Sequence, residues 1–168
     1  MPAFKTLGGH YRIRVKDLVR VLREKGIPVP AALEPRFTIA VVDEDAAFQA
    51  QIRGFFSAKP GTFEIKPFLN GYDALMEIGR KSPDLVLLNV RLTSLDGFQL
   101  LSRLKSNPDT EGLKILAISD IPADAQTAVS TGAVDAFTKS DGFPALLEKI
   151  KRVADDKFLD FPTLPSEM

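Results

Sequence analysis

The sequence has no cysteine and a single histidine, His10. Without cysteine there can be no disulfide bond, no thiolate zinc site and no cysteine nucleophile. One histidine in a basic N-terminal segment can build neither a serine–histidine cluster nor a metal–histidine cluster. We therefore expect that the protein is not an enzyme.

Long apolar runs are also lacking. No run approaches the roughly 18 residues that a membrane-spanning helix needs. The first residues do not show the charged and then apolar pattern of a signal peptide. We therefore expect a cytoplasmic protein with no membrane partner.

The net charge is zero, but the charges are unevenly distributed. Residues 1–36 contain eight basic and three acidic side chains, so the rest of the chain carries an equal acidic excess. A basic head on an acidic body suggests that the two parts have different functions.

A proline-rich stretch separates these two parts. Pro28, Pro30 and Pro35 lie among small residues, which is typical of a linker. We predict four regions, which are an N-terminal extension (1–27), a linker (28–35), a main domain (36–155) and a C-terminal tail (156–168).

The main domain alternates strand-like and helix-like patterns. The predicted strands are apolar runs at 37–42, 62–69, 84–89, 114–119 and 134–138. The predicted helices follow them, first through Phe48, Ile52 and Phe55 and then at 72–80, 98–105, 123–130 and 144–153. Five strand–helix pairs of this size predict an α/β fold, a doubly wound five-stranded parallel sheet with helices on both faces.

Polar side chains follow four of the predicted strands, where each strand ends. They are Asp43 with Glu44, Asn89, Ser119 and Lys139. In such sheets functional groups gather at the carboxyl ends of the strands. Acids that suit Mg²⁺, a hydroxyl and a lysine at one edge fit phosphoryl chemistry. The nucleophile is missing, because the amide of Asn89 cannot attack a phosphoryl donor as a carboxylate would.

These motifs, in this order and at these spacings, resemble the response regulator receiver domain. The matching segments are Val41–Glu44, 83–92 with Asp96 and Gly97, Ala117–Ser119, Gly132–Ala133 and Thr138–Lys139. The resemblance covers residues 36–155 and implies the flavodoxin-like (βα)5 receiver fold. It also implies roles, with Asp43, Glu44 and the carbonyl of Arg91 as metal ligands. Ser119 would be the phosphoryl-sensing switch residue and Lys139 the family's conserved-type cation.

The chain departs from the family at the positions that make and transmit the phosphoryl signal. Asn89 replaces the phosphoacceptor aspartate, and Thr93 replaces a usual proline. Ala136 stands where an aromatic switch residue is usual, and Ser140 replaces the proline after the lysine. An engineered Asn89 would not explain the other three changes, so we favour a natural pseudo-receiver.

The alternative is that the other residues at these strand ends have structural roles and take no part in phosphoryl chemistry. Without a charge at Asn89 we expect no required cofactor and only weak Mg²⁺ binding. Lys139 could then be a structural cation paired with Asp43 or Glu44. Phe137 should point away from Ala136 into the core, because side chains alternate along a strand. Asp120 is predicted to cap the helix that follows it.

The basic head has strand-like flanks around Gly8 and Gly9, followed by an amphipathic helix that ends at Gly26. It resembles the wing and following helix of excisionase-type, MerR-like winged helix-turn-helix domains. The two helices that precede the wing in that family are missing here, so we expect a start that is truncated or was assigned late. The side chains that could contact DNA phosphates are Lys5, His10, Arg12 and Arg14.

Three hypotheses follow for the function. The first is a phosphorylation-independent signalling receiver in a DNA-binding transcriptional regulator. It would contact a protein partner or a second copy through its last two helices and fifth strand, and DNA if the upstream helices are present. The second is a phosphorylatable two-component receiver whose acceptor aspartate has been replaced by Asn89. The third is a module that binds a small ligand in the vacant acidic pocket.

Overall fold

The computed structural model describes residues 3–5, 11–13, 15–33, 36–58 and 63–154. The chain divides into two compact units, Met1–Arg36 and Phe37–Met168. No helix in the described ranges is long and apolar enough to cross a membrane.

The first unit contains a short hairpin and a helix. Strands β1 (Ala3–Lys5) and β2 (Tyr11–Ile13) pair in antiparallel fashion, with Lys5 opposite Tyr11. The predicted Gly8–Gly9 turn, His10 and Arg14 lie outside the described residues. Helix α1 (Val15–Glu24) follows, and Gly26 comes just after it with a positive φ of 68°, which suits a glycine helix stop. A 3-10 turn, η1 (Ala31–Leu33), ends the unit.

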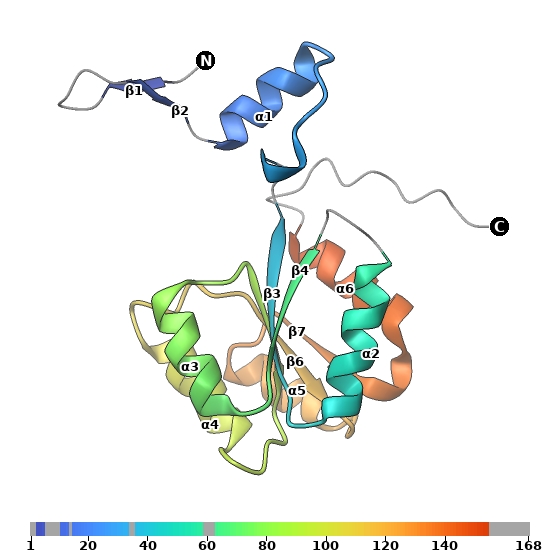
Figure 1. Cartoon of the computed structure of the whole chain (residues 1–168). Coiled ribbons are helices and arrows are strands. Elements are labelled where there is room, and N and C mark those ends of the chain that lie inside the picture. The colour runs from blue at the N-terminus through green and yellow to red at the C-terminus, as the bar shows by residue number, and fades with distance from the viewer. Residues whose placement is uncertain (1–2, 6–10, 14, 34–35, 59–62, 155–168) are drawn as a thin grey trace. The chain divides into compact units, whose positions relative to one another are not determined.

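The second unit is built on a five-stranded parallel sheet, as predicted (Figure 1). Its strand order is β4-β3-β5-β6-β7. The strands are β3 (Phe37–Val42), β4 (Phe63–Phe68), β5 (Leu85–Asn89), β6 (Ile115–Ser119) and β7 (Asp135–Thr138). Numbered within the unit, this is the order 2-1-3-4-5 of flavodoxin-like folds, so the predicted fold class is confirmed.

Helices cover both faces of the sheet, as a doubly wound fold requires (Figure 1). The helices are α2 (Ala46–Ser57), α3 (Gly71–Arg80), α4 (Gly97–Ser106), α5 (Asp124–Thr131) and α6 (Phe143–Ala154), with a 3-10 turn η2 (Lys139–Asp141) before the last. Buried side chains of α2 and α6 pack in one apolar cluster, and those of α3, α4 and α5 pack in the other.

The central strand β5 shows why its sequence is a continuous apolar run. Leu85 and Leu87 belong to the cluster under α2 and α6, whereas Val86 and Leu88 belong to the cluster under α3, α4 and α5. Every residue of β5 is buried. A strand that is covered on both faces needs apolar side chains at odd and even positions alike, and this buried strand delivers Asn89 to the edge of the sheet.

Most predicted elements begin or end within one residue of the observed ones, but one predicted cap is wrong. Asp120 is exposed and does not cap α5, which begins at Asp124. The residue at the cap position is Ala123, whose side chain makes no capping hydrogen bond. The acid that matters at this helix is therefore Asp124, in the first turn.

Candidate functional site

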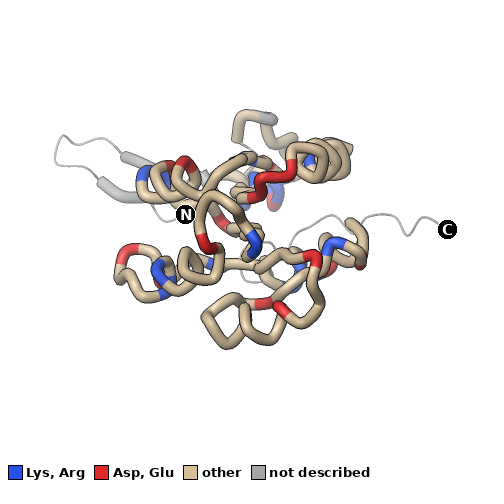
Figure 2. Tube along the Cα trace, turned by 90° about the horizontal axis from the view of Figure 1, so that it is seen from below, with Lys and Arg blue, Asp and Glu red and all other residues tan. Residues whose placement is uncertain are grey.

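The predicted site residues meet at one edge of the sheet. Asp43 follows β3, Asn89 ends β5, Ser119 ends β6 and Lys139 follows β7. Parallel strands bring their carboxyl ends to the same side. Figure 2 shows the backbone trace from below, with acidic positions in red and basic positions in blue. Three of the four are nearly inaccessible, with Asp43 1% exposed, Ser119 5% and Asn89 7%.

The Asp43 carboxylate is held by three donors. Its Oδ2 accepts hydrogen bonds from Asn89 Nδ2 at 3.1 Å and from Lys139 Nζ at 2.9 Å. Its Oδ1 accepts one from the backbone N–H of Asp45 at 2.9 Å. A buried carboxylate needs such partners, because an unpaired buried charge is costly.

Lys139 also contacts several partners. Its ammonium lies 4.3 Å from the centroid of the Phe48 ring, a cation–π distance, and 3.9 Å from Asp45 Oδ2 in addition to its contact with Asp43. These contacts support the structural role that the sequence left open for Lys139. The next residue, Ser140, lies in the η2 turn.

Asn89 uses both ends of its amide. Nδ2 donates to Asp43, and Oδ1 accepts a hydrogen bond from the backbone N–H of Arg91 at 2.8 Å. The amide therefore joins the end of β3 to the loop after β5. An aspartate here could accept the bond from Arg91, but it could not donate to Asp43 and would bring a second negative charge against it.

Glu44 does not join Asp43. Its Oε2 accepts hydrogen bonds from Thr93 N at 2.7 Å and Thr93 Oγ1 at 2.5 Å, and its Oε1 accepts one from Ser94 N at 2.8 Å. Hydrogen bonds from Ser94 and Thr93 lower the pKa of Glu44 to about 2. The departure at Thr93 has a structural use, because a proline at this position would lack both the N–H and the hydroxyl.

Arg91 acts through its side chain. Its Nε donates to Asp124 Oδ2 at 2.8 Å and its Nη2 to Asp124 Oδ1 at 2.6 Å, a bidentate pair between the β5–α4 loop and α5. The guanidinium also lies 5.8 Å from the centroid of the Phe98 ring. The sequence pointed only to the backbone carbonyl of Arg91, and Asp124 was not singled out at all.

Ser119 belongs to the same group. Its Oγ donates to Asp124 Oδ2 at 2.5 Å and accepts from the backbone N–H of Ile121 at 3.0 Å. Hydrogen bonds from Arg91 hold the pKa of Asp124 below its ordinary value, and the bond from Ser119 acts in the same direction while burial opposes both. The hydrogen bond to Asp124 in turn raises the pKa of Arg91.

Ala136 packs beside the small residues of β6 and α5. It lines a narrow gap with Ala117, Ser119 and Ala128, and that gap has no room for a water molecule. Phe137 is buried in the opposite cluster, under α2 and α6, as alternation along the strand predicted. Phe137 therefore does not take the place of the aromatic side chain that Ala136 lacks.

The acids at this edge do not fit a Mg²⁺ ion. Mg²⁺ requires several oxygen ligands in a near-octahedral arrangement. Asp43 is bound to Lys139 and Asn89, whereas Glu44 is turned toward Thr93 and Ser94. Within the described part of the chain, no three acidic or histidine side chains are grouped so that they could hold a metal.

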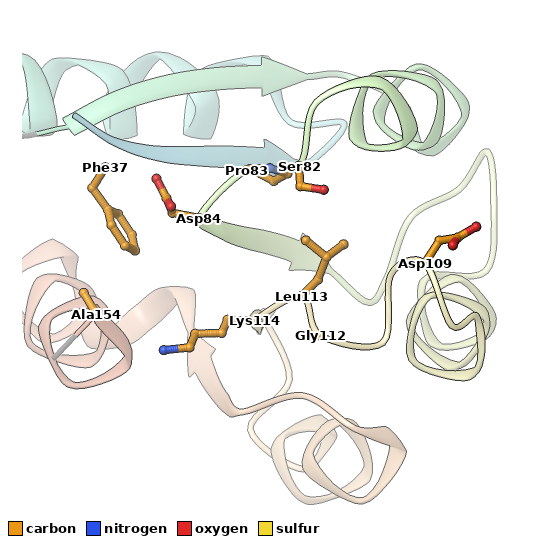
Figure 3. A pocket seen from close by; sticks show the side chains of 9 residues that line it. All are labelled: Phe37, Ser82, Pro83, Asp84, Asp109, Gly112, Leu113, Lys114 and Ala154. Atoms are coloured by element: carbon orange, nitrogen blue, oxygen red, sulfur yellow. The ribbon is translucent and has the colours of Figure 1, made fainter. Parts of the chain in front are cut away.

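A separate pocket of about 320 Å³ lies at the opposite edge of the sheet (Figure 3). Phe37, Asp84 and Lys114 line it where β3, β5 and β6 begin. Asp84 accepts a hydrogen bond from Thr38 N at 2.9 Å, and Lys114 donates one to Val153 O at 2.8 Å. This pocket is remote from Asn89 and so gives no support to a ligand bound among the acids.

The predicted DNA-contacting residues lie in the first unit. Lys5 is the last residue of β1 and Arg12 is in β2, whereas His10 and Arg14 lie outside the described residues. Lys5 and Arg12 thus lie on the two strands of one hairpin, one register position apart.

Comparisons with known proteins agree on the family. The sequence model of the response regulator receiver domain matches residues 39–151. The chain is 32% identical over 138 residues to a protein-glutamate methylesterase/protein-glutamine glutaminase of Halalkalibacterium halodurans, covering 79% of this chain and 39% of that protein. It is 29% identical over 115 residues to the phosphate regulon transcriptional regulatory protein PhoB of Rhizobium meliloti, covering 67% and 50%. The chain therefore spans about half or less of these relatives.

Solved structures give the same result. The signal receiver domain of a DNA binding response regulator protein (merR) from Colwellia psychrerythraea matches with a TM-score of 0.64 and 26% identity, over 71% of this chain and 98% of that one. A receiver domain from Bermanella marisrubri matches with a TM-score of 0.64 and 29% identity, over 71% and 99%. Because the family model covers more than half of the chain, this protein belongs to the response regulator receiver domain family.

Proposed function

We propose that this receiver works in signal transduction without phosphorylation of an aspartate, as a protein-interaction module of a transcriptional regulator. The observation that carries the proposal is the amide of Asn89, which stands at the acceptor position and bonds to Asp43 and to the N–H of Arg91. An amide has no charged oxygen with which to attack a phosphoryl donor. Asn89 therefore serves as a hydrogen-bonding residue and not as a phosphoryl acceptor.

The neighbouring residues support the proposal. Asp43 and Lys139 neutralise each other at 2.9 Å, and Glu44 holds the loop after β5 through Thr93. Asp43, Glu44 and Lys139 are held in place by these contacts. The two acids would have to break their hydrogen bonds before they could bind a metal ion. The second candidate is a phosphorylatable two-component receiver whose acceptor aspartate has been replaced by Asn89, because Asp43, Ser119 and Lys139 are all retained.

The interaction surface that we propose is the face of α5, β7 and α6. Two large apolar side chains, Val129 of α5 and Val134 before β7, are exposed there. Both belong to the surface that we propose a partner or a second copy would cover. We propose no catalytic residue in this chain, although the methylesterase is among its relatives.

We further propose that the N-terminal extension contributes to a DNA-binding domain. The hairpin of β1 and β2, the helix α1 and the basic excess of residues 1–36 support this assignment. Lys5, His10, Arg12 and Arg14 would contact the phosphate backbone, which orients a protein on DNA but does not select a sequence. The region boundaries at 27, 35 and 155 belong to the same proposal.

The test is the binding of beryllofluoride, a phosphoryl mimic that needs an acceptor carboxylate and Mg²⁺. We expect no fluorine NMR signal of bound beryllofluoride with the unaltered chain. The Asn89→Asp variant is the comparison, since it restores the acceptor carboxylate by a single substitution at the cost of the hydrogen bond from Asn89 to Asp43. Mg²⁺-dependent binding to the unaltered chain would contradict the proposal. Binding to the variant, together with a change of oligomeric state, would favour the replaced-acceptor candidate.

A further inference from the structure

Three segments of the receiver meet at one buried carboxylate. Asp124, in the first turn of α5, is 5% exposed and accepts two hydrogen bonds from Arg91 of the β5–α4 loop and one from Ser119 at the end of β6. We call Arg91, Ser119 and Asp124 together the Asp124 latch. Its members come from different elements, and Arg91 and Asp124 are 33 positions apart in the sequence.

The latch consumes the only proton that Ser119 can offer. A serine hydroxyl has one proton to donate, and here it points to Asp124 Oδ2 at 2.5 Å. The hydroxyl oxygen is also engaged, because it accepts the N–H of Ile121 at 3.0 Å. Ser119 therefore cannot donate a hydrogen bond to a group on residue 89 unless it first leaves Asp124.

The chemistry of the latch resembles that of a bound phosphoryl group. Asp124 supplies an anionic oxygen that accepts the Ser119 hydroxyl, and Arg91 supplies the cation that balances the charge in a bidentate pair. A phosphoryl group on residue 89 would offer Ser119 the same kind of acceptor. An internal carboxylate already does so.

We propose that Asp124 is a built-in anion that occupies the switch serine and holds the end of β6 and the start of α5 in one conformation, whatever the state of residue 89. This inference rests on the proposed phosphorylation-independent function and names the residues that regulate it. Ser119, Arg91 and Asp124 are positioning residues that act on the α5 and β7 face. The fixed position of α5 then presents the exposed Val129 constantly to a partner.

The geometry distinguishes the latch from an ordinary surface ion pair. Exposed pairs contribute little because solvent screens both charges. Here the Arg91 side chain is half exposed, but that of Asp124 is 7% exposed and has a second donor in Ser119. Charge-assisted, bidentate bonds to a buried carboxylate are the stronger and more directional class.

The test compares hydrogen exchange of the unaltered chain with that of Asp124→Asn and Ser119→Ala. Asp124→Asn keeps the shape but removes the charge that holds Arg91, and Ser119→Ala removes only the hydroxyl. We expect amides of the β6–α5 loop and the first turn of α5 to exchange roughly tenfold faster or more in Asp124→Asn, because a hydrogen-bonded charge is lost. Glu148→Gln, an exposed charge change on α6, is the control and should leave these amides unchanged.

A second arm uses the Asn89→Asp background with beryllofluoride and Mg²⁺. In Asn89→Asp alone, we expect beryllofluoride to change the NMR chemical shifts only of amides near residue 89. In the double variant Asn89→Asp with Asp124→Asn, we expect the changes to extend across α5 and β7. Unchanged exchange in both Asp124→Asn and Ser119→Ala would overturn the latch. Spread of the response to α5 in Asn89→Asp alone would overturn it as well.

The two proposals can fail separately. Beryllofluoride binding by the unaltered chain contradicts the proposed function but leaves the exchange comparison in place. If Asn89→Asp takes up no beryllofluoride, the exchange arm alone decides for or against the latch.

Discussion

Replacing Asn89 by aspartate should destabilise the domain through charge. Asn89 Nδ2 lies 3.1 Å from Asp43 Oδ2, so Asn89→Asp exchanges a hydrogen bond for the approach of two carboxylates. Two unit charges about 4 Å apart repel by about 4 kcal/mol at an effective dielectric constant of about 20. Lys139, 2.9 Å from Asp43, offsets part of this repulsion. We expect a net loss of about 2 kcal/mol in the free energy of unfolding at pH 7.

The sign of the pH dependence follows from the same contact. Repulsion by Asp43 and burial both raise the folded-state pKa of the new carboxyl above its unfolded value of about 4. Below about pH 4 the carboxyl is protonated in both states, so the variant should be nearly as stable as the parent chain. As the pH rises, the unfolded chain ionises first, and the loss of stability grows.

Urea unfolding at pH 4 and pH 7 measures this difference. Asn107→Asp is the matched control, because Asn107 is exposed at the end of α4, where solvent screens a new charge. Equal stability of Asn89→Asp and the parent chain at pH 7 would refute the reasoning. A loss as large at pH 4 as at pH 7 would also refute it, since the cause would then be packing and not charge.

Two further substitutions test the loop after β5. Thr93→Pro removes the two Thr93 donors from Glu44 and leaves the Ser94 donors in place, so the pKa of Glu44, now about 2, should rise part of the way toward its ordinary value in an NMR titration. Because the pKa of Glu44 is lower in the folded than in the unfolded protein, its ionised form stabilises the fold at pH values above the unfolded-state pKa. The difference in unfolding free energy between Thr93→Pro and the parent chain should therefore shrink as the pH falls toward 2. A difference that does not change with pH would contradict this account. Gly97→Ala places a Cβ 2.5 Å from Val90 Cα and should cost about 1–3 kcal/mol in urea unfolding, whereas Gly79→Ala, with open space around it, should cost nothing.

The gathering of Asp43, Asn89, Ser119 and Lys139 at one edge could be predicted from the sequence. Strand ends are readable because β5 and its neighbours are apolar runs, and parallel strands place their carboxyl ends together. The opposite directions of Ala136 and Phe137 follow from the two-residue period of a strand and needed no further information.

The hydrogen-bond partners within the loops could not be predicted. Asp43 and Glu44 are adjacent, yet one faces Lys139 and the other faces Thr93, because loop backbone angles set the directions of their side chains. The missed residue, Asp124, is an acid in the first turn of a helix, a common place for an exposed charge. Its burial and its bonds to Arg91 and Ser119 distinguish it from Asp120, four positions earlier, which was predicted to cap the helix.

The central claim is that residue 89 carries no phosphoryl group. Incubation of the whole chain with acetyl phosphate and Mg²⁺, followed by intact mass spectrometry at neutral pH, tests it most directly, with Asn89→Asp treated in parallel. We predict that the unaltered chain keeps its mass and that any added phosphoryl group appears only on the variant. Addition of one acid-stable, base-labile phosphoryl group to the unaltered chain would contradict the account.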